Sequence, residues 1–396
     1  MKSHWRLPRG VDELLPPDAW GLELLRRQVL DLYVSWGFEY VELPIIEYLD
    51  ALLVGSGEDL DLQTLKVVDQ VTGRQLGVRA DMTSQAVRVD AHSRVVDGVQ
   101  RLCYAGPVVF ANPQLAQTSR VPIKAGAEIF GASSLSADAE VINLMLQTMH
   151  TAGVNEPVLL LGHMGIYRGL VSALRQQGEL AEQDEAELFR CVQRKSESDI
   201  RALLGQSDLA GMMAALPQQM LQVTAAAPTL DQVRHALNGA PQAVLAALDE
   251  LETLIALVLE QGFCESLRID VSELSGYGYH TGPVFAVYHP TAGSALAQGG
   301  RYDGVGEVFG RARPATGFDV MLKNLVLSAA QQTPAATPVI FAPWVDQAAR
   351  ASLILKVREL RQQGHVVWSA LSAQEIPTPQ MRVLQLVNGE WQLADQ

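Results

Sequence analysis

The sequence predicts an α+β protein, with an antiparallel sheet, a helical insertion and a small C-terminal α/β domain. Strand-like and helical stretches cluster separately along most of the chain, which favours antiparallel pairing over a doubly wound parallel sheet. A low-complexity segment at 328–338, "SAAQQTPAATP", separates the last part of the chain. We therefore expect one domain over residues 1–330, with the helical insertion at 165–262, and a second domain over 331–396.

The composition is that of an ordinary globular protein, with 48% hydrophobic and 19% charged residues among 396. No apolar run approaches the roughly 18–20 residues of a membrane span, and the N-terminus has no signal-peptide pattern, so we expect a cytoplasmic protein. Three separate cysteines and eight histidines lack metal-ligand spacing, so no metal or other cofactor is expected. The net charge of −14 argues weakly against a nucleic-acid partner, because an acidic protein can still carry a local basic groove.

The first elements follow from hydrophobic periodicity and end signals. Residues 18–36 predict a helix, which Asp18 can cap and Gly37 ends. A strand, "FEYVELPII", contains Pro44 and suits an edge or an interface. Residues 65–81 then predict a hairpin that turns at Thr72-Gly73, and Thr83 can cap a helix that runs to about Val96.

The middle of the chain continues this pattern of strands and helices. Two strands, "RLCYAGPVVF" and "VPIKAGAEIFG", precede a helix at 137–152 that carries Asp138 and Glu140 near its start. Within the helical insertion, the clearest helix begins at Pro241 and ends at Gly262. Three more strands and one helix are expected at 266–272, 283–289, 294–298 and about 319–329.

The last residues predict one βαβ unit and a hairpin. "PVIFAP", an amphipathic helix at 346–363 and "HVVWSA" form the unit, and "QLVNGEWQL" turns at Asn-Gly.

Two carboxylates invite more than one interpretation. In "GVRADMTSQAVR", Asp81 or Thr83 caps the following helix and Arg79 pairs with an acid, or Asp81 accepts a ligand ammonium in a pocket. Glu128 stands in an otherwise apolar strand, so it lies either on the solvent face or paired in a pocket. The residues alone do not decide either case.

Two glycine-rich segments carry no recognised catalytic pattern. "QGGRYDGVG" lacks the phosphate-loop spacing, so its glycines suit a tight turn or a close backbone approach. In "SGYGYHTGPVF", His280 has no serine, cysteine or carboxylate at the spacing of a nucleophilic pair. An isolated histidine of this kind is more often structural than catalytic.

Taken in order, seven segments resemble the catalytic core of histidyl-tRNA synthetases over residues 5–330. They are "WGFEYVELPIIE", "VRADMT", "YAGPVVF", "AGAEIFG", "GYGYHTGPVF", "GGRYDGVG" and "ATGFDVMLKNL". The resemblance implies a class II aminoacyl-tRNA synthetase-like fold, with a self-dimer formed through the first helix and the strand around Pro44. It also implies that the C-terminal domain resembles a truncated anticodon-binding domain.

The chain departs from that family where the family handles ATP. Phe110, Ser275 and Asn324 stand where the resemblance implies arginines, and Asn112 stands where it implies a glutamate. Donors aimed at developing charge are each worth about 10²–10³ in rate, although losses within one site are not additive. We therefore expect no catalytic residue and no synthetase activity.

The amino-acid side of the implied pocket is better retained. The resemblance places Asp81 where the family binds the substrate ammonium, with Thr83 beside it. Glu128 and Tyr279 match residues near the bound imidazole, and His280 replaces a tyrosine. Lys124 replaces a glutamine, where it either meets the histidine carboxylate or pairs with Glu128 and closes the pocket.

This combination resembles the regulatory subunits of ATP phosphoribosyltransferase, whose "Y-x-Y-H-T-G-x-V-F" segment is matched by "YGYHTGPVF". The resemblance implies a chain that activates a short-form catalytic subunit in the first step of histidine biosynthesis. It also implies a hetero-octamer that histidine inhibits, with no tRNA and no membrane as partner. A divergent histidyl-tRNA synthetase and a tRNA-binding module are the alternatives.

Overall fold

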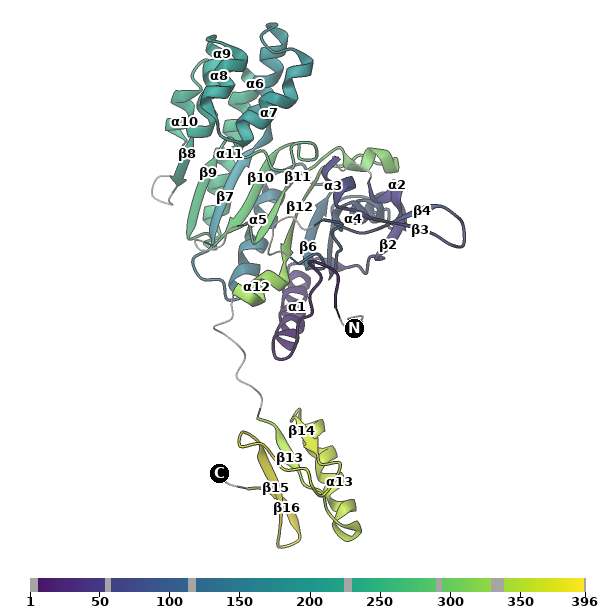
Figure 1. Ribbon diagram of the computed structural model, residues 1–396. Coiled ribbons are helices and arrows are strands. Elements are labelled where there is room, and N and C mark those ends of the chain that lie inside the picture. Colours follow the sequence, from purple (N-terminus) through teal and green to yellow (C-terminus); the bar gives the residue numbers. More distant parts are fainter. Residues whose placement is uncertain are drawn as a thin grey trace. The chain divides into compact units, whose positions relative to one another are not determined.

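The computed structural model describes residues 6–53, 58–112, 119–223, 230–289, 294–328 and 338–394. The chain divides into two compact units, Met1–Ala330 and Gln331–Gln396 (Figure 1). Among the described residues, no helix combines the length and apolar character that crossing a membrane requires.

The larger unit is built on a nine-stranded sheet in the order β1-β5-β6-β12-β11-β10-β7-β9-β8. In that order the strands are Glu39–Tyr40, Gln100–Pro107, Ile123–Phe130, Ala315–Met321, Ala297–Arg301, Pro283–Tyr288, Val158–His163, Ser266–Asp270 and Met220–Val223. Only β1–β5 and β7–β9 pair in parallel. The prediction of a mainly antiparallel sheet is therefore confirmed.

Long helices cover one face of this sheet. α1 (Asp18–Ser35) packs on β5 and on α5 (Leu135–Thr151), and α5 packs in turn on β12 and on α11 (Gln242–Glu260). α12 (Leu322–Ser328) lies against α1. Successive side chains of a strand point to opposite faces, so alternate residues of β6, among them Ala125, Ala127 and Ile129, enter this core.

The other face carries a smaller core and the candidate site. α4 (Thr83–Arg88) and the 3₁₀ turn η4 (Val305–Phe309) cover it, beside a small sheet of β2 (Ile46–Tyr48), β4 (Gln75–Val78) and β3 (Leu65–Val68). Short helices α2 (Leu49–Leu52) and α3 (Glu58–Gln63) precede β3. Tyr104 of β5, Phe130 of β6 and Tyr302 are buried in this second core.

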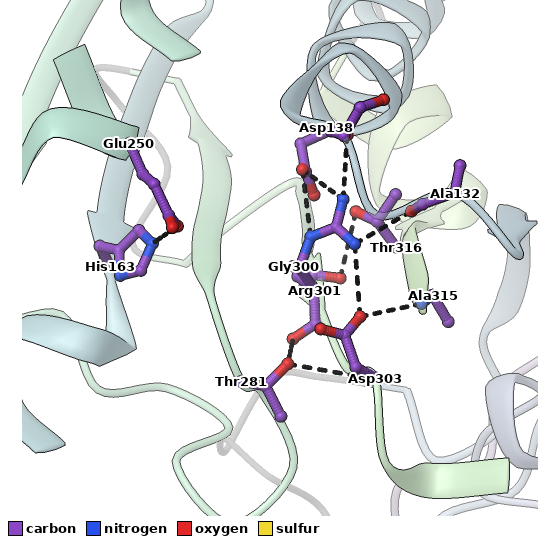
Figure 2. A network of polar contacts seen from close by, with 11 residues as sticks. Ala132, Asp138, His163, Glu250, Thr281, Gly300, Arg301, Asp303, Ala315 and Thr316 are labelled. Atoms are coloured by element: carbon purple, nitrogen blue, oxygen red, sulfur yellow. Dashed lines mark hydrogen bonds and ion pairs between the residues drawn. The ribbon is translucent and has the colours of Figure 1, made fainter. Parts of the chain in front are cut away.

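The helical insertion extends from the far end of the sheet, next to β7, β9 and β8 (Figure 1). Besides α11, its helices are α6 (Met164–Gln176), α7 (Glu185–Gln193), α8 (Glu197–Leu204), α9 (Asp208–Ala215) and α10 (Asp231–Ala236). His163 caps α6, since its Nδ1 accepts the Gly165 N–H at 3.0 Å. Its Nε2 lies 3.0 Å from Glu250 of α11, which ties the two helices together (Figure 2).

The smaller unit is a four-stranded sheet in the order β14-β13-β15-β16 with one helix. Its elements are β13 (Ile340–Ala342), α13 (Gln347–Gln362), β14 (Val367–Ser369), β15 (Arg382–Val387) and β16 (Glu390–Leu393). β13 and β14 are parallel, as the βαβ prediction requires. Asn388 and Gly389, with φ of +51° and +87°, make the predicted hairpin turn.

Several local predictions are wrong. Residues 315–321 form β12, so the last helix of the larger unit begins at Leu322 and not near 319. The strand expected at 294–298 is β11 at 297–301, and it includes Gly299 and Gly300. Pairing with β6 on one side and β11 on the other supports β12, and sequence periodicity does not reveal such pairing.

The start of the chain also differs from expectation. The helix expected to reach Val96 ends at Arg88 and continues as a single π-helical turn over Val89–Ser93. Asp18 and Thr83 are first helical residues, and neither caps its helix. The predicted strand at 38–46 is divided: Glu39–Tyr40 pairs as β1, and Ile46 is the first residue of β2 in the small sheet.

Candidate functional site

The candidate site lies on the face of β6 opposite the long helices. Glu128 is its centre: Oε1 lies 2.7 Å from the Tyr104 hydroxyl, and Oε2 lies 2.5 Å from the Tyr302 hydroxyl. The glutamate is only 1% exposed. Burial raises its pKa to about 8, against an ordinary value of 4.5, so the group holds its proton at neutral pH. Glu128 is thus buried and paired, and does not lie on the solvent face.

Two glycines make room for the side chains of Glu128 and Tyr104 over the neighbouring strands. A Cβ added at Gly317, which pairs with Glu128 across β12 and β6, would stand 1.5 Å from Glu128 Oε2. A Cβ at Gly126 would stand 2.6 Å from the Tyr104 ring. Both positions therefore require glycine for close approach, and this cross-strand requirement is invisible in the sequence.

Lys124 lies four residues before Glu128 in β6, on the same face of the strand. It does not pair with Glu128. Its Nζ lies 3.2 Å from Asp81 Oδ1 and 3.0 Å from Asp319 Oδ2. Burial disfavours the charged ammonium, but Asp319 and Asp81 outweigh that effect and raise the pKa of Lys124. Of the two alternatives left open for Lys124, the structure therefore does not have the pair with Glu128, and Asp319 joins the candidate site although the sequence does not single it out.

Asp81 stands at the entrance of α4. Its Oδ2 accepts the Thr83 N–H at 3.2 Å, and the Thr83 hydroxyl lies 3.3 Å from the Tyr104 hydroxyl. Burial opposes its ionisation, yet the charge of Lys124 and the hydrogen bonds from Lys124 and Thr83 lower its pKa overall. Arg79, in contrast, forms no ion pair with an acid of the described residues: it donates to the carbonyls of Leu43 and Pro107 at 2.6 and 2.8 Å.

The loop at 275–282 brings Tyr279 and His280 to the same cluster. The Tyr279 ring stacks on Tyr302, with centroids 4.9 Å apart, and His280 meets Tyr279 edge-on at 5.2 Å. Among the described residues, neither the buried Tyr279 hydroxyl nor the buried Nδ1 of His280 has a hydrogen-bond partner. Burial lowers the pKa of His280 to about 4, so this imidazole is neutral at pH 7. Two unpaired polar atoms are thus held at the edge of the cluster.

The network behind this loop fixes its position (Figure 2). The Thr281 N–H donates to the carbonyl of Arg301 at 2.7 Å, and the Arg301 guanidinium bonds to Asp138 of α5 at 2.5 Å. Asp303 accepts from Arg301 at 3.3 Å and from the Ala315 N–H at 3.0 Å. Asp138, expected only as a helix-start acid, is therefore the fully buried partner of Arg301.

Each of the four positions expected to have lost ATP contacts has partners other than Glu128 among the described residues. Phe110 is buried in the second core, and Asn112 donates to the Leu62 carbonyl at 3.3 Å. The Ser275 N–H bonds to Glu273 at 2.8 Å, and the Asn324 amide lies 3.8 Å from the Met321 sulfur. Arg120 does lie near Phe110, but its Nε donates to the Phe110 carbonyl at 2.9 Å.

A separate cavity of about 310 Å³ opens between the insertion and the loop. Arg168, Arg175, Glu185 and Tyr277 line it together with three further residues of α6. The Tyr277 hydroxyl donates to Glu185 at 3.0 Å, and Arg168 donates to the Tyr277 carbonyl at 2.6 Å. The described residues contain no group of three His, Cys, Asp or Glu side chains arranged for a metal ion.

Comparison with known proteins follows the division of the chain. The histidyl-tRNA synthetase family profile matches residues 10–325, and the profile described as ATP phosphoribosyltransferase subunit HisZ C-terminal domain matches 337–394. A solved Bacillus halodurans protein, described as ATP phosphoribosyltransferase regulatory subunit/histidyl-tRNA synthetase, superposes with a TM-score of 0.81 at 26% identity over 95% of each chain. A Nostoc histidyl-tRNA synthetase superposes at 0.76 and 16% identity over 95% of this chain and 88% of that one, which shows the fold alone.

The fold and these matches define a protein of the class II histidyl-tRNA synthetase type. A relative from Pseudomonas syringae pv. syringae is 46% identical over 373 residues, which cover 94% of this chain and 92% of the relative. One from Ectopseudomonas mendocina is 45% identical over 397 residues, covering 99% and 98%. Both are named ATP phosphoribosyltransferase regulatory subunit. The chain belongs to this family of regulatory subunits, as its motifs indicated, and is not itself the catalytic chain.

Proposed function

We propose that this chain is the regulatory partner of a short-form ATP phosphoribosyltransferase catalytic subunit, which it activates and whose inhibition by histidine it helps to transmit. Membership of the family supports a regulatory role in histidine biosynthesis. The observation that carries the proposal is a contrast within one fold. Asp81, Glu128 and Tyr279 still gather on the amino-acid side, whereas Phe110, Ser275 and Asn324 supply no cation for ATP.

Activation in this proposal is a population shift. The chain would bind an active conformation of the catalytic subunit more tightly than an inactive one, and histidine would reverse that preference. The complex would be a hetero-octamer, and it would bind neither tRNA nor membranes.

Reconstitution tests this function most directly. Purified chain mixed with a short-form catalytic subunit should co-elute with it and raise the rate of phosphoribosyl-ATP synthesis above that of the catalytic subunit alone. Absence of both effects would contradict the proposal. Histidine-dependent exchange between ATP and pyrophosphate, measured on the chain alone, should stay at background, since a clear exchange signal would instead favour a divergent synthetase.

The candidate histidine site consists of Asp81, Thr83, Lys124, Glu128, Tyr279 and His280. An imidazole needs one partner for its N–H and one for its ring nitrogen, and a carboxyl group and a phenol meet that need. The unpaired Tyr279 hydroxyl is such a partner. Calorimetry should show weaker histidine binding for Tyr279→Phe by about tenfold, the worth of one buried hydrogen bond. Equal affinity would place the histidine site elsewhere, for instance on the catalytic subunit.

A further inference from the structure

The Lys124 ammonium occupies an unusual place in the candidate site. Its side chain is 7% exposed, and it lies between two carboxylates whose side chains are 23% (Asp81) and 14% (Asp319) exposed. The three residues come from β6, from the entrance of α4 and from β12. The register of β6 and β12, in which Lys124 pairs with Met321, brings Lys124 beside Asp319, and the entrance of α4 adds Asp81.

An amino acid and a lysine side chain end in the same group. Both present a primary ammonium with three N–H donors and no acceptor. Asp81, the proposed partner of a ligand ammonium, already accepts Lys124 on Oδ1 and the Thr83 N–H on Oδ2. A ligand ammonium that approaches Asp81 therefore meets a carboxylate that a cation of the same kind has already neutralised.

We propose that Lys124 is a built-in occupant of the ammonium subsite, so that an amino acid binds at Asp81 only by displacing it. This inference rests on the proposed histidine site. It also gives Asp319 a definite part: Asp319 holds Lys124 in place from the side opposite Asp81.

Removal of Lys124 alone would leave Asp81 and Asp319 buried without a cation, which destabilises a fold strongly. The informative variant is therefore Lys124→Gln together with Asp319→Asn, which removes one positive and one negative charge. The matched control is Lys356→Gln with Glu359→Gln, an exposed lysine–glutamate pair 3.0 Å apart on α13. Thermal unfolding of both double variants establishes that each is folded.

Three probes then separate the possible roles of Lys124 in calorimetry on the full chain. Histidine carries both an ammonium and a carboxylate, histamine carries only the ammonium, and imidazolepropionate carries only the carboxylate. If Lys124 competes with the ligand ammonium, the site variant should bind histidine and histamine at least about tenfold more tightly than wild type. Imidazolepropionate should gain nothing, and the control variant should match wild type for all three probes.

Two results would overturn the inference. Weaker binding of histidine and imidazolepropionate, with histamine unchanged, would show that Lys124 grips the ligand carboxylate. Unchanged affinity, or no binding of any probe by either protein, would show that Lys124 does not guard an ammonium subsite. Activation of the catalytic subunit without histidine is measured separately, so its loss would count against the proposed function and not against the role of Lys124.

Discussion

Glu128 shows how a single buried group makes the stability of the protein depend on pH. The folded chain keeps this proton up to about pH 8, whereas the unfolded chain releases it near the ordinary value of 4.5. The folded state therefore binds more protons between these values, and the free energy of unfolding falls as pH rises through that window.

Glu128→Gln should remove this contribution because an amide does not ionise. Denaturant unfolding at pH 5 and pH 9 should show that the variant loses less stability on going to pH 9 than wild type, by on the order of 3 kcal/mol. Because both proteins contain all the other titratable groups, the difference between their pH dependences reports Glu128 alone. Glu307→Gln, at an exposed position, serves as control and should keep the wild-type slope. Parallel curves for Glu128→Gln and wild type would mean that Glu128 is ionised in the folded protein.

At the scale of elements, the ion pair between β11 and α5 holds the site loop from behind. Arg301 is 7% exposed and Asp138 is fully buried, so loss of Asp138 leaves the buried guanidinium with only the more exposed Asp303 as its acidic partner. Asp138→Asn should lower the free energy of unfolding by about 3 kcal/mol. Glu140→Gln, two residues later on α5, breaks the half-exposed pair with Arg101 and should cost less than about 1 kcal/mol. Equal losses of unfolding free energy in the two variants would show that the buried Arg301–Asp138 pair stabilises the fold no more than the Arg101–Glu140 pair does.

The elements also show where sequence analysis succeeds. The helices α1, α5 and α11 and the hairpin at Asn388-Gly389 are predicted because their signals are local. The last residues of β12, 319–321, are predicted as the start of a helix, because the support of this strand comes from pairing with β6 and β11, which a local pattern does not show. The site divides in the same way. Asp81, Glu128 and Tyr279 stood out within motifs, whereas Tyr104, Tyr302 and Asp319 join them only through cross-strand register.

At the scale of the whole molecule, the surface around the small sheet exposes several apolar side chains. Tyr40, Ile45 and Ile46 are 42%, 45% and 48% exposed there, close in sequence to Pro44, where we propose that the self-dimer forms. Val68 of β3 is 66% exposed in the same small sheet as Ile46. Such an apolar grouping is typical of an interface.

Ile46→Asp should therefore convert a dimer into a monomer in light scattering, since a charge at a buried interface is costly. Leu371→Asp, at a position 83% exposed in the smaller unit, should leave the mass unchanged. A dimer that survives Ile46→Asp would move the interface to another surface.

The loop at 275–282 links the helical insertion to the candidate site. Tyr277 packs against Tyr167 and Phe189 of the helical insertion, with ring centroids 5.2 and 5.1 Å away, while Tyr279 stacks on Tyr302 in the site. Only Gly278 separates the two tyrosines, so their Cα atoms lie no more than about 7 Å apart. Because this link is so short, the two rings cannot move far apart from each other. A displacement of the Tyr279 ring from Tyr302 would therefore be passed through this short link to the contacts of Tyr277 with Tyr167 of α6 and Phe189 of α7.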